Sequence, residues 1–451
     1  MKKYIALMIS AAIIMSFVSA CGDDDVTEET GAEGSVYFLN FKPESEAAYK
    51  KVAESFTEET GIPINIVTAA AGTYEQKLTS EITKSEAPTI FQVNGPIGLE
   101  SWEDYCMDLQ GTDLYEMLSD KNLALKDGDE VYAVPYTVEG FGIIYNDSIM
   151  QKYFKMEDSV VESVDEIKNF DTFKAVVEDM TAKKDELGIE GVFASTSMAS
   201  GEQWRWTSHL ANVPFYYEFH DLGKELDPVT TALGSESVNF SYNEGFKNMF
   251  DLYINNSVTA PTLIGGKTTA DSMSEFALGK AAMVQNGNWA MSQIAGVSGN
   301  TVTEDDVKMM PIYIGAEGEE DSGICVGTEN YLAINDEASD ADKQASLKFL
   351  EWLFSSETGK NYVLNDLGFI SPFNTFEDDE KPADPLGSQV VEWISNKGVT
   401  SVPWVFTAFP SDEFKNRFGD ALLQYAQGTG DWNNVVTAVT ENWASEYALT
   451  R

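Results

Sequence analysis

Histidine and cysteine are scarce in this chain, which has 2 histidines and 3 cysteines among 451 residues. His209 and His220 are too few for a multi-histidine metal site, and neither has the sequence context of a Ser-His-Asp triad. The H-E-x-x-H, G-x-S-x-G and P-loop motifs are also missing. The sequence therefore argues against the common enzyme classes and predicts no metal site and no cofactor.

Basic residues are scarce as well. The 29 Lys and Arg residues stand against 74 Asp and Glu residues, which gives a formal net charge of −45. A field of this sign repels nucleic acid and anionic lipid, so it excludes nucleic acid as a partner. It mainly indicates a strongly solvated surface, and it disfavours an anionic ligand unless a local basic pocket overrides it.

Long apolar runs are absent after residue 20, so no later segment is long and apolar enough to cross a membrane. The one such run, at 5–17, follows Met1-Lys2-Lys3 and ends in Val18-Ser19-Ala20-Cys21. A basic start, an apolar core and small residues before a cleavage point predict a signal peptide at 1–20. The small-small-Cys ending resembles a bacterial lipobox. This resemblance implies a lipid on Cys21 and a location on the extracytoplasmic face of the bacterial cell membrane.

Residues 21–34 are rich in acids and contain no aromatic residue, which predicts a flexible tether between the lipid and the folded part. After Cys21 only Cys106 and Cys325 remain. These two form one disulfide in an oxidising compartment or serve as two small buried apolar residues, and the sequence leaves both alternatives open.

The periodicity from Ser35 onward predicts strands that alternate with helices. Strand-like runs at 36–39, 64–67 and 89–93 are separated by helical spacing over 44–60 and 72–84. This alternation is typical of an α/β fold with a parallel sheet covered by helices. Further strand pieces are expected at 131–135 and 140–145, and further helices at 171–187, 244–255, 271–278, 342–354, 412–427 and 433–448.

Two kinds of side chain stand out as candidates for sugar binding. The chain has 9 tryptophans, and Trp289 follows a predicted strand in a glycine-flanked loop. Aromatic faces stack on the C–H faces of sugars, although core packing is the commoner role for any single tryptophan. Glu139 lies between two strand pieces, close to Tyr136. Such a carboxylate accepts charge-assisted hydrogen bonds from neighbouring sugar hydroxyls, or it is simply a solvated turn residue.

The segments FALGKAAM at 276–283 and NGNW at 286–289 are similar to the F-x-x-G-K-A-A-M and N-G-x-W of family 1 extracellular solute-binding proteins. These are the receptors of ABC sugar importers, to which the maltose-binding protein belongs. Weaker matches occur at 56–62, 87–91 and 349–353, in the same order as in the family. The resemblance runs from about Ser35 to the C-terminus.

The resemblance also implies roles for single residues. Trp289 matches the family's cleft tryptophan, and Glu139 matches an acid that contacts sugar hydroxyls. Glu202 and Trp204 match an acid and an aromatic residue of the second lobe. The loop 92–94 lacks the family's aromatic residue there, which argues against a maltodextrin ligand. The other positions that the resemblance places at the ligand are Asn40, Lys42, Asn94, Phe414 and Arg417. Tyr136 beside Glu139 and Trp206 beside Trp204 are further candidates from the sequence itself.

The implied fold is α/β, with two lobes of the type II periplasmic-binding kind and a ligand cleft between them. The first lobe is expected at 35–137 plus 315–357, and the second at 139–311 plus 359–451. The resemblance implies a monomeric receptor of an ABC importer, lipid-anchored, that binds a neutral oligosaccharide, closes by a hinge motion and delivers the ligand to membrane permease subunits. The alternatives are an extracellular carbohydrate-active enzyme that uses paired acids such as Glu139 and Glu202, or a polyamine receptor.

Overall fold

The computed structural model describes residues 34–450, except for 71, 200, 224–225 and 378–379. The predicted signal peptide at 1–20, the lipidation site Cys21 and the tether up to residue 33 lie outside the described residues. Among the helices of the described part, none combines the length and the apolar character needed to cross a membrane.

The first of two mixed sheets has the strand order β2-β1-β3-β11-β5-β4. Its strands are β1 (Val36–Asn40), β2 (Ile64–Thr68), β3 (Ile90–Asn94), β4 (Leu125–Asp127), β5 (Glu130–Pro135) and β11 (Asn330–Ile334). β1 pairs in parallel with β2 and β3, as the alternating pattern predicted, whereas β11 runs antiparallel between β3 and β5. A late strand thus returns to the first sheet.

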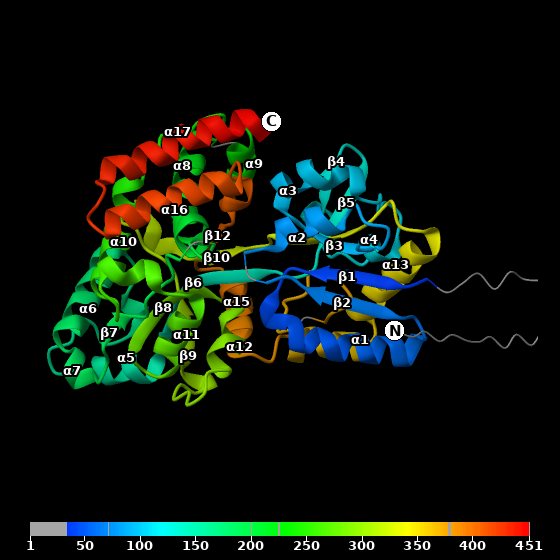
Figure 1. The fold of residues 1–451 in the computed structure, drawn as a ribbon. Helices are drawn as coiled ribbons and strands as arrows, with labels where there is room; N and C mark the ends of the chain where they lie inside the picture. Colours follow the sequence, from blue (N-terminus) through cyan, green and yellow to red (C-terminus); the bar gives the residue numbers. More distant parts are fainter. Residues whose placement is uncertain (1–33, 71, 200, 224–225, 378–379, 451) are drawn as a thin grey trace, which may run out of the picture.

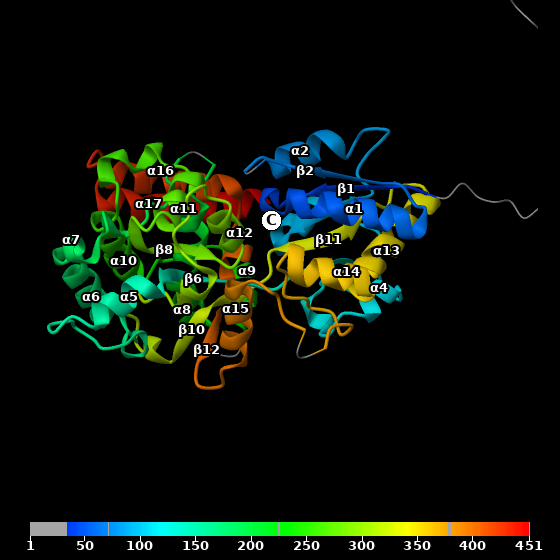
Figure 2. The ribbon, with the colours of Figure 1, turned by 90° about the horizontal axis from the view of Figure 1, so that it is seen from below.

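Helices cover both faces of this sheet (Figures 1 and 2). They are α1 (Glu46–Thr60), α2 (Tyr74–Glu81), α3 (Gly95–Trp102), α4 (Asp113–Glu116), α13 (Asp340–Ser355) and α14 (Glu357–Asn361). α1 buries Tyr49, Val52 and Phe56 and ends at Gly61, whose φ of 77° is a left-handed conformation that glycine adopts without steric cost. Phe56 meets Phe349 of α13 with ring centroids 5.1 Å apart. The predicted helical face is confirmed.

The second sheet has the order β12-β10-β6-β8-β7, with β9 also beside β6. Its strands are β6 (Glu139–Asn146), β7 (Gly191–Phe193), β8 (Ala281–Gly287), β9 (Val307–Met310), β10 (Ser322–Gly327) and β12 (Thr400–Pro403). β6 is buried at every residue, because strands pair with both of its edges and apolar clusters cover both of its faces. This central strand follows directly on the segment that leaves the first sheet.

The helices around the second sheet form the other body in Figure 1, which ends in α16 and α17. They are α5 (Asp147–Phe154), α6 (Phe170–Ala182), α7 (Lys184–Leu187), α8 (Ala211–Leu222), α9 (Pro228–Leu233), α10 (Asn243–Asn255), α11 (Thr269–Ala277), α12 (Ala290–Ala295), α15 (Pro385–Ser395), α16 (Asp412–Ala426) and α17 (Trp432–Thr450). The predicted helix at 171–187 is divided at Lys183 into α6 and α7. α5, α8, α9, α12 and α15 were not predicted.

Strand pairing corrects two of the expected lobe boundaries. β10 pairs with β6 and β12 of the second sheet, although 315–357 was expected in the first lobe. Conversely, Val363, Phe369 and Phe373 pack into the core of the first sheet, although 359–451 was expected in the second lobe. The hydrogen bonds of β10 decide to which lobe this strand belongs. We propose lobes of 35–135 plus 330–376 and of 139–327 plus 385–450.

Two short crossings bring the ends of the two sheets together. β5 leads into β6 through residues 136–138, and β10 leads into β11 through residues 328–329. β1, β3 and β5 therefore end, and β11 begins, at the edge of the first sheet that faces the crossings. At the facing edge of the second sheet β6 begins and β8, β10 and β12 end. We call this region the interlobe junction.

The return of α13 to the first sheet can be tested at Leu350, which is fully buried there. Leu350→Ala is expected to lower the free energy of unfolding by about 2–5 kcal/mol, because it leaves a cavity in a packed core. Lys348→Ala on the exposed side of the same helix is the control and should change it little. Urea unfolding measures both, and equal effects would contradict this packing.

Candidate functional site

Trp289 lies at the interlobe junction because the loop after β8 is tied to β6. The Asn288 backbone N–H donates to the Gly140 carbonyl at 3.0 Å, and the Gly140 N–H donates to Asn288 Oδ1 at 3.0 Å. A Cβ atom at Gly287 would lie 2.2 Å from the Trp289 ring, so only glycine leaves room for the indole. The NGNW segment thus places the ring beside the start of β6, next to Glu139.

Trp404 approaches the same place from the end of β12. A Cβ atom at Gly327 would lie 2.5 Å from Trp404 Cγ, so a second glycine makes room for a second indole. The Trp289 and Trp404 ring centroids are 6.4 Å apart, with planes at 87°. This edge-to-face geometry is the favoured one for aromatic pairs.

A π-helix at Arg205–Leu210 supplies the third aromatic wall. Trp204 stacks beneath the Arg205 guanidinium, 3.9 Å from it, and lies 6.2 Å from Trp289 between ring centroids. His209 is five residues after Trp204, and their rings meet at 4.8 Å and 80°. The i,i+5 period of a π-helix brings this pair together, and such turns are frequent at functional sites.

His209 is a neutral part of this aromatic cluster. Its ring stacks on Phe141 with centroids 4.1 Å apart and planes at 10°. Burial, assisted by the positive charge of Arg205, holds the pKa of His209 well below its usual range. We define the aromatic cluster as Trp204, His209, Trp289 and Trp404, with Phe141 and Phe406 behind them.

A buried ion pair adjoins the aromatic cluster. Lys42 Nζ lies 2.8 Å from Glu139 Oε1, 3.7 Å from Glu44 Oε1 and 5.8 Å from the Trp289 ring centroid. Burial opposes the charge of Lys42, but attraction to Glu139 and Glu44 outweighs it and raises the pKa of Lys42. Burial also raises the pKa of Glu139, and Lys42 offsets this only in part. The pair joins the loop after β1 to the first crossing.

Many buried polar atoms at the junction have no hydrogen-bond partner among the described residues. Donors and acceptors occur together: indole and amide N–H groups, hydroxyl groups and an amide oxygen. These atoms are Trp289 Nε1, Trp404 Nε1, Gln92 Nε2, Tyr136 OH, Thr328 Oγ1, Asn330 Oδ1 and His209 Nδ1. Buried polar groups are nearly always paired, so a concentration of exceptions marks groups that have another partner.

The other predicted residues differ in whether their polar side chains are already hydrogen-bonded within the protein. Tyr136 is buried in the first crossing, where its hydroxyl lies beside the Gln92 side chain, and Asn94 is half-buried at the end of β3. The Asn40 amide donates to the Lys42 carbonyl at 2.8 Å, so it shapes the Lys42 loop. Glu202 Oε2 accepts from the Thr269 N–H and hydroxyl and thereby holds the start of α11.

Three predicted contacts are wrong. Trp206 is fully buried against Phe250 and Tyr253, and its indole N–H donates to the Ser197 carbonyl. Phe414 is fully buried in the core around α16 and α17. Arg417 points to the surface, where it pairs with Glu413 at 2.7 Å. In α16, Lys415 and Asp412, rather than Phe414 and Arg417, interact electrostatically with the junction residue Glu329.

Two aromatic residues and one polar crossing segment at the junction were not predicted from the sequence. His209 and Trp404 belong to the aromatic cluster, and the crossing segment Thr328–Asn330 carries unpartnered polar groups. Trp404 directly follows a strand, as Trp289 does, and this shared position was the available signal. Nothing in the local sequence marks a π-helix or a two-residue crossing, so His209 and Thr328–Asn330 gave no signal.

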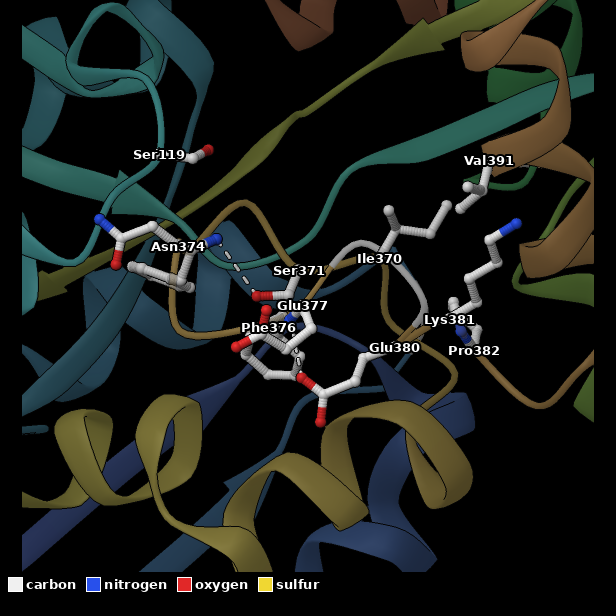
Figure 3. Close-up of a pocket in the computed structure, with 11 residues that line it drawn as sticks. Ser119, Ile370, Ser371, Asn374, Phe376, Glu377, Glu380, Lys381, Pro382 and Val391 are labelled. Atoms are coloured by element: carbon white, nitrogen blue, oxygen red, sulfur yellow. Dashed lines mark hydrogen bonds between the residues drawn. The ribbon is translucent and has the colours of Figure 1, made fainter.

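Two hollows of the structure lie apart from the aromatic cluster. One of 520 Å³ is lined by the turn at 370–377, by Lys381 and by Val391 of α15 (Figure 3). Another, of 680 Å³, lies between α3 and β4 on one side and Val229 and Leu233 of α9 on the other. Neither is lined by a tryptophan or by Glu139, so the rings at the junction pack against one another.

The two remaining cysteines are free and buried, Cys106 beside the first sheet and Cys325 in the second. The structure therefore favours the alternative of two small buried apolar residues. Within the part of the chain that the structure describes, no group of His, Cys, Asp or Glu side chains has the arrangement of a metal site.

Comparisons with known proteins agree with this architecture. Residues 51–386 match the family described as bacterial extracellular solute-binding protein. A multiple sugar-binding protein of Streptococcus mutans is 21% identical over 398 residues, which cover 85% of this chain and 86% of that protein. A family 1 extracellular solute-binding protein from Bifidobacterium longum subsp. infantis has a TM-score of 0.61 at 19% identity, covering 92% of this chain and 100% of that one.

A sugar transporter from Bacillus licheniformis in complex with stachyose has a TM-score of 0.63 at 18% identity, and the match covers 91% of this chain and 100% of that one.

The chain belongs to the bacterial extracellular solute-binding protein family, because the family match spans most of its length. The predicted two-lobed α/β fold is confirmed. Membership also confirms the expectation of a binding protein rather than an enzyme, and it implies an extracytoplasmic location.

The Lys42–Glu139 pair makes a pH-dependent prediction. Lys42→Met leaves Glu139 buried without its cation, which should lower the free energy of unfolding by about 3–5 kcal/mol near pH 7. The folded-state pKa of Glu139 is raised, so protonation favours the folded state. The deficit should therefore shrink as the pH falls toward the usual glutamate pKa of about 4.3.

Urea unfolding at both pH values measures this deficit. Lys50→Met, which breaks an exposed pair with Glu46, is the matched control and should cost at most about 1 kcal/mol. Adding Glu139→Gln to Lys42→Met should restore part of the lost stability near pH 7. A deficit that does not change with pH would show that Glu139 is not the group left uncompensated.

Proposed function

We propose that this protein is the lipid-anchored receptor of an ABC importer and that it binds a neutral oligosaccharide at the interlobe junction. Two of the similar proteins are a multiple sugar-binding protein and a sugar transporter seen with stachyose. Their match to this chain supports a sugar as the ligand. The proposal rests further on the chemistry of the junction.

The observation that carries the proposal is the mixture of unpartnered donors and acceptors beside indole rings. Trp289 Nε1 and Trp404 Nε1 need acceptors, whereas Asn330 Oδ1 needs a donor. A hydroxyl group both donates and accepts, so an uncharged sugar can satisfy both kinds. An ammonium group only donates, and a carboxylate only accepts. The mixture therefore favours a sugar over a polyamine or an acidic ligand.

The aromatic cluster and the buried carboxylate complete the match. Indole faces offer apolar area to the C–H faces of a sugar, while Glu139 accepts hydrogen bonds from its hydroxyls. Lys42 Nζ lies 2.8 Å from Glu139 Oε1, so it orients this carboxyl group and partly opposes the burial that raises its pKa. Trp289, Trp204, Glu139 and Lys42 are the residues that we propose contact the ligand, with Tyr136 and Asn94 at its edge.

Binding would be coupled to closure of the lobes. Residues of both sheets surround the junction, and the two short crossings must bend if the lobes are to separate. A ligand that contacts both lobes binds the closed form better and so shifts the population toward it. We propose that the closed monomer docks on the permease subunits in the membrane and releases the sugar to them.

Trp289→Ala is expected to weaken sugar binding by about 1–3 kcal/mol, because it removes a stacking surface at the centre of the site. Isothermal titration against stachyose, raffinose and maltotriose measures the change. Trp432→Ala is the matched control, since Trp432 lies on α17 with its indole N–H bonded to Asn243. Equal affinity of the Trp289 variant and the wild type would remove the ring from the site, and no binding by any panel member would count against a sugar ligand.

Lipid anchoring is tested at Cys21. Cys21→Ser removes the thiol that would carry the lipid, so the protein should move from the membrane fraction to the soluble fraction of expressing bacteria. Labelled fatty acid should be incorporated into the wild type and not into the variant. Cys106→Ser is the control and should stay with the membrane. Retention of the Cys21 variant in the membrane fraction would contradict the anchor.

A further inference from the structure

The second crossing carries polar side chains that are hydrogen-bonded neither to the first crossing nor to the aromatic cluster. β10 ends at Gly327 and β11 begins at Asn330, so Thr328 and Glu329 alone connect the sheets there. The Gly95 backbone N–H donates to the Glu329 carbonyl at 2.8 Å and fixes this backbone against α3. The crossing is thus held in place, and its side chains are not required to stabilise it.

Three consecutive side chains of this segment have unmet hydrogen-bonding capacity. Asn330 is 2% exposed, and its Oδ1 atom has no partner within the described residues. Thr328 Oγ1 is likewise buried without a partner. The Glu329 carboxylate is half-buried and makes neither a hydrogen bond nor an ion pair with any described residue. Leaving such groups unpaired costs free energy, so the segment is shaped for something other than its own stability.

Charge around Glu329 links it to the junction. It interacts electrostatically with Lys42 and Glu139 on one side and with Lys415 and Asp412 of α16 on the other. Both ammonium groups are already paired, Lys42 with Glu139 at 2.8 Å and Lys415 with Asp412 at 3.1 Å. Glu329 is the carboxylate left over between these two pairs. Burial raises its pKa, and Lys415 only partly opposes this.

We propose that Glu329 is a second ligand-contacting carboxylate and a specificity-determining residue, which accepts hydrogen bonds from neighbouring hydroxyls of the bound sugar. A carboxylate has two acceptor oxygens that suit a pair of adjacent hydroxyls, and bonds to a charged acceptor are strong. Glu139 and Glu329 would then hold the sugar from the first and second crossings. The inference rests on the proposed function, because it names a further contact of the same site.

The test compares Glu329→Gln with the wild type by isothermal titration against stachyose, raffinose, maltotriose and spermidine. Glu329→Gln keeps the shape but loses one acceptor and the charge, so any sugar that binds the wild type should bind it roughly tenfold more weakly or worse. Glu58→Gln on the exposed face of α1 is the control and should bind like the wild type. Without sugar, the unfolding midpoint of Glu329→Gln should stay the same or rise, because a partnerless buried charge is removed.

The outcomes separate this inference from the proposed function. Weaker sugar binding by Glu329→Gln with an unchanged or raised unfolding midpoint supports a ligand contact. Equal sugar affinity of Glu329→Gln and the wild type overturns the inference while the sugar receptor stands. A lowered midpoint without sugar assigns Glu329 a structural role and also overturns it. Binding of spermidine alone, or of no probe by the wild type, rejects the proposed function and the inference together.

Discussion

The buried pair of Lys42 and Glu139 is the interaction on which the junction depends. Lys42 belongs to the loop after β1, and Glu139 opens β6, so the pair fixes the first crossing against the first sheet. Burying two charges costs more than their attraction returns unless the geometry is close and further groups assist. Here Glu44 and the Trp289 ring lie near the ammonium group. Because Gly140 beside Glu139 holds the loop of Trp289, the same pair also sets the position of the indole.

Large aromatic rings packed against glycine residues give the junction its shape. Gly287 ends β8 and Gly327 ends β10, on either side of β6, and each leaves room for an indole that a methyl group would displace. The two indoles, together with Trp204 and the neutral ring of His209, form a rigid apolar wall. Rings that are held by their neighbours lose little conformational freedom when a ligand stacks on them, which favours affinity.

The polar groups of the crossings lie in the same segments that must bend when the lobes move apart. Glu139 stands at the first crossing and Thr328–Asn330 at the second, and these short segments must bend if the lobes separate. A ligand that satisfies their unpaired groups therefore stabilises one lobe arrangement over another. Under the proposed function, the ligand would satisfy these groups and so would favour the closed form.

The sequence alone determined the local elements and the family. Periodicity located most helices and the first three strands within a few residues, because amphipathic spacing and glycine stops act over one or two turns. The sequence context pointed to Trp289 and Glu139 and the family resemblance to Lys42, and these three lie together at the junction. Only the tertiary structure decided that β10 joins the second sheet, that Trp206 and Phe414 are core residues, and that His209 and Glu329 lie at the junction. Sheet partners, the facing of a helix turn and charge neighbours depend on contacts between residues far apart in the chain, and no short pattern encodes those contacts.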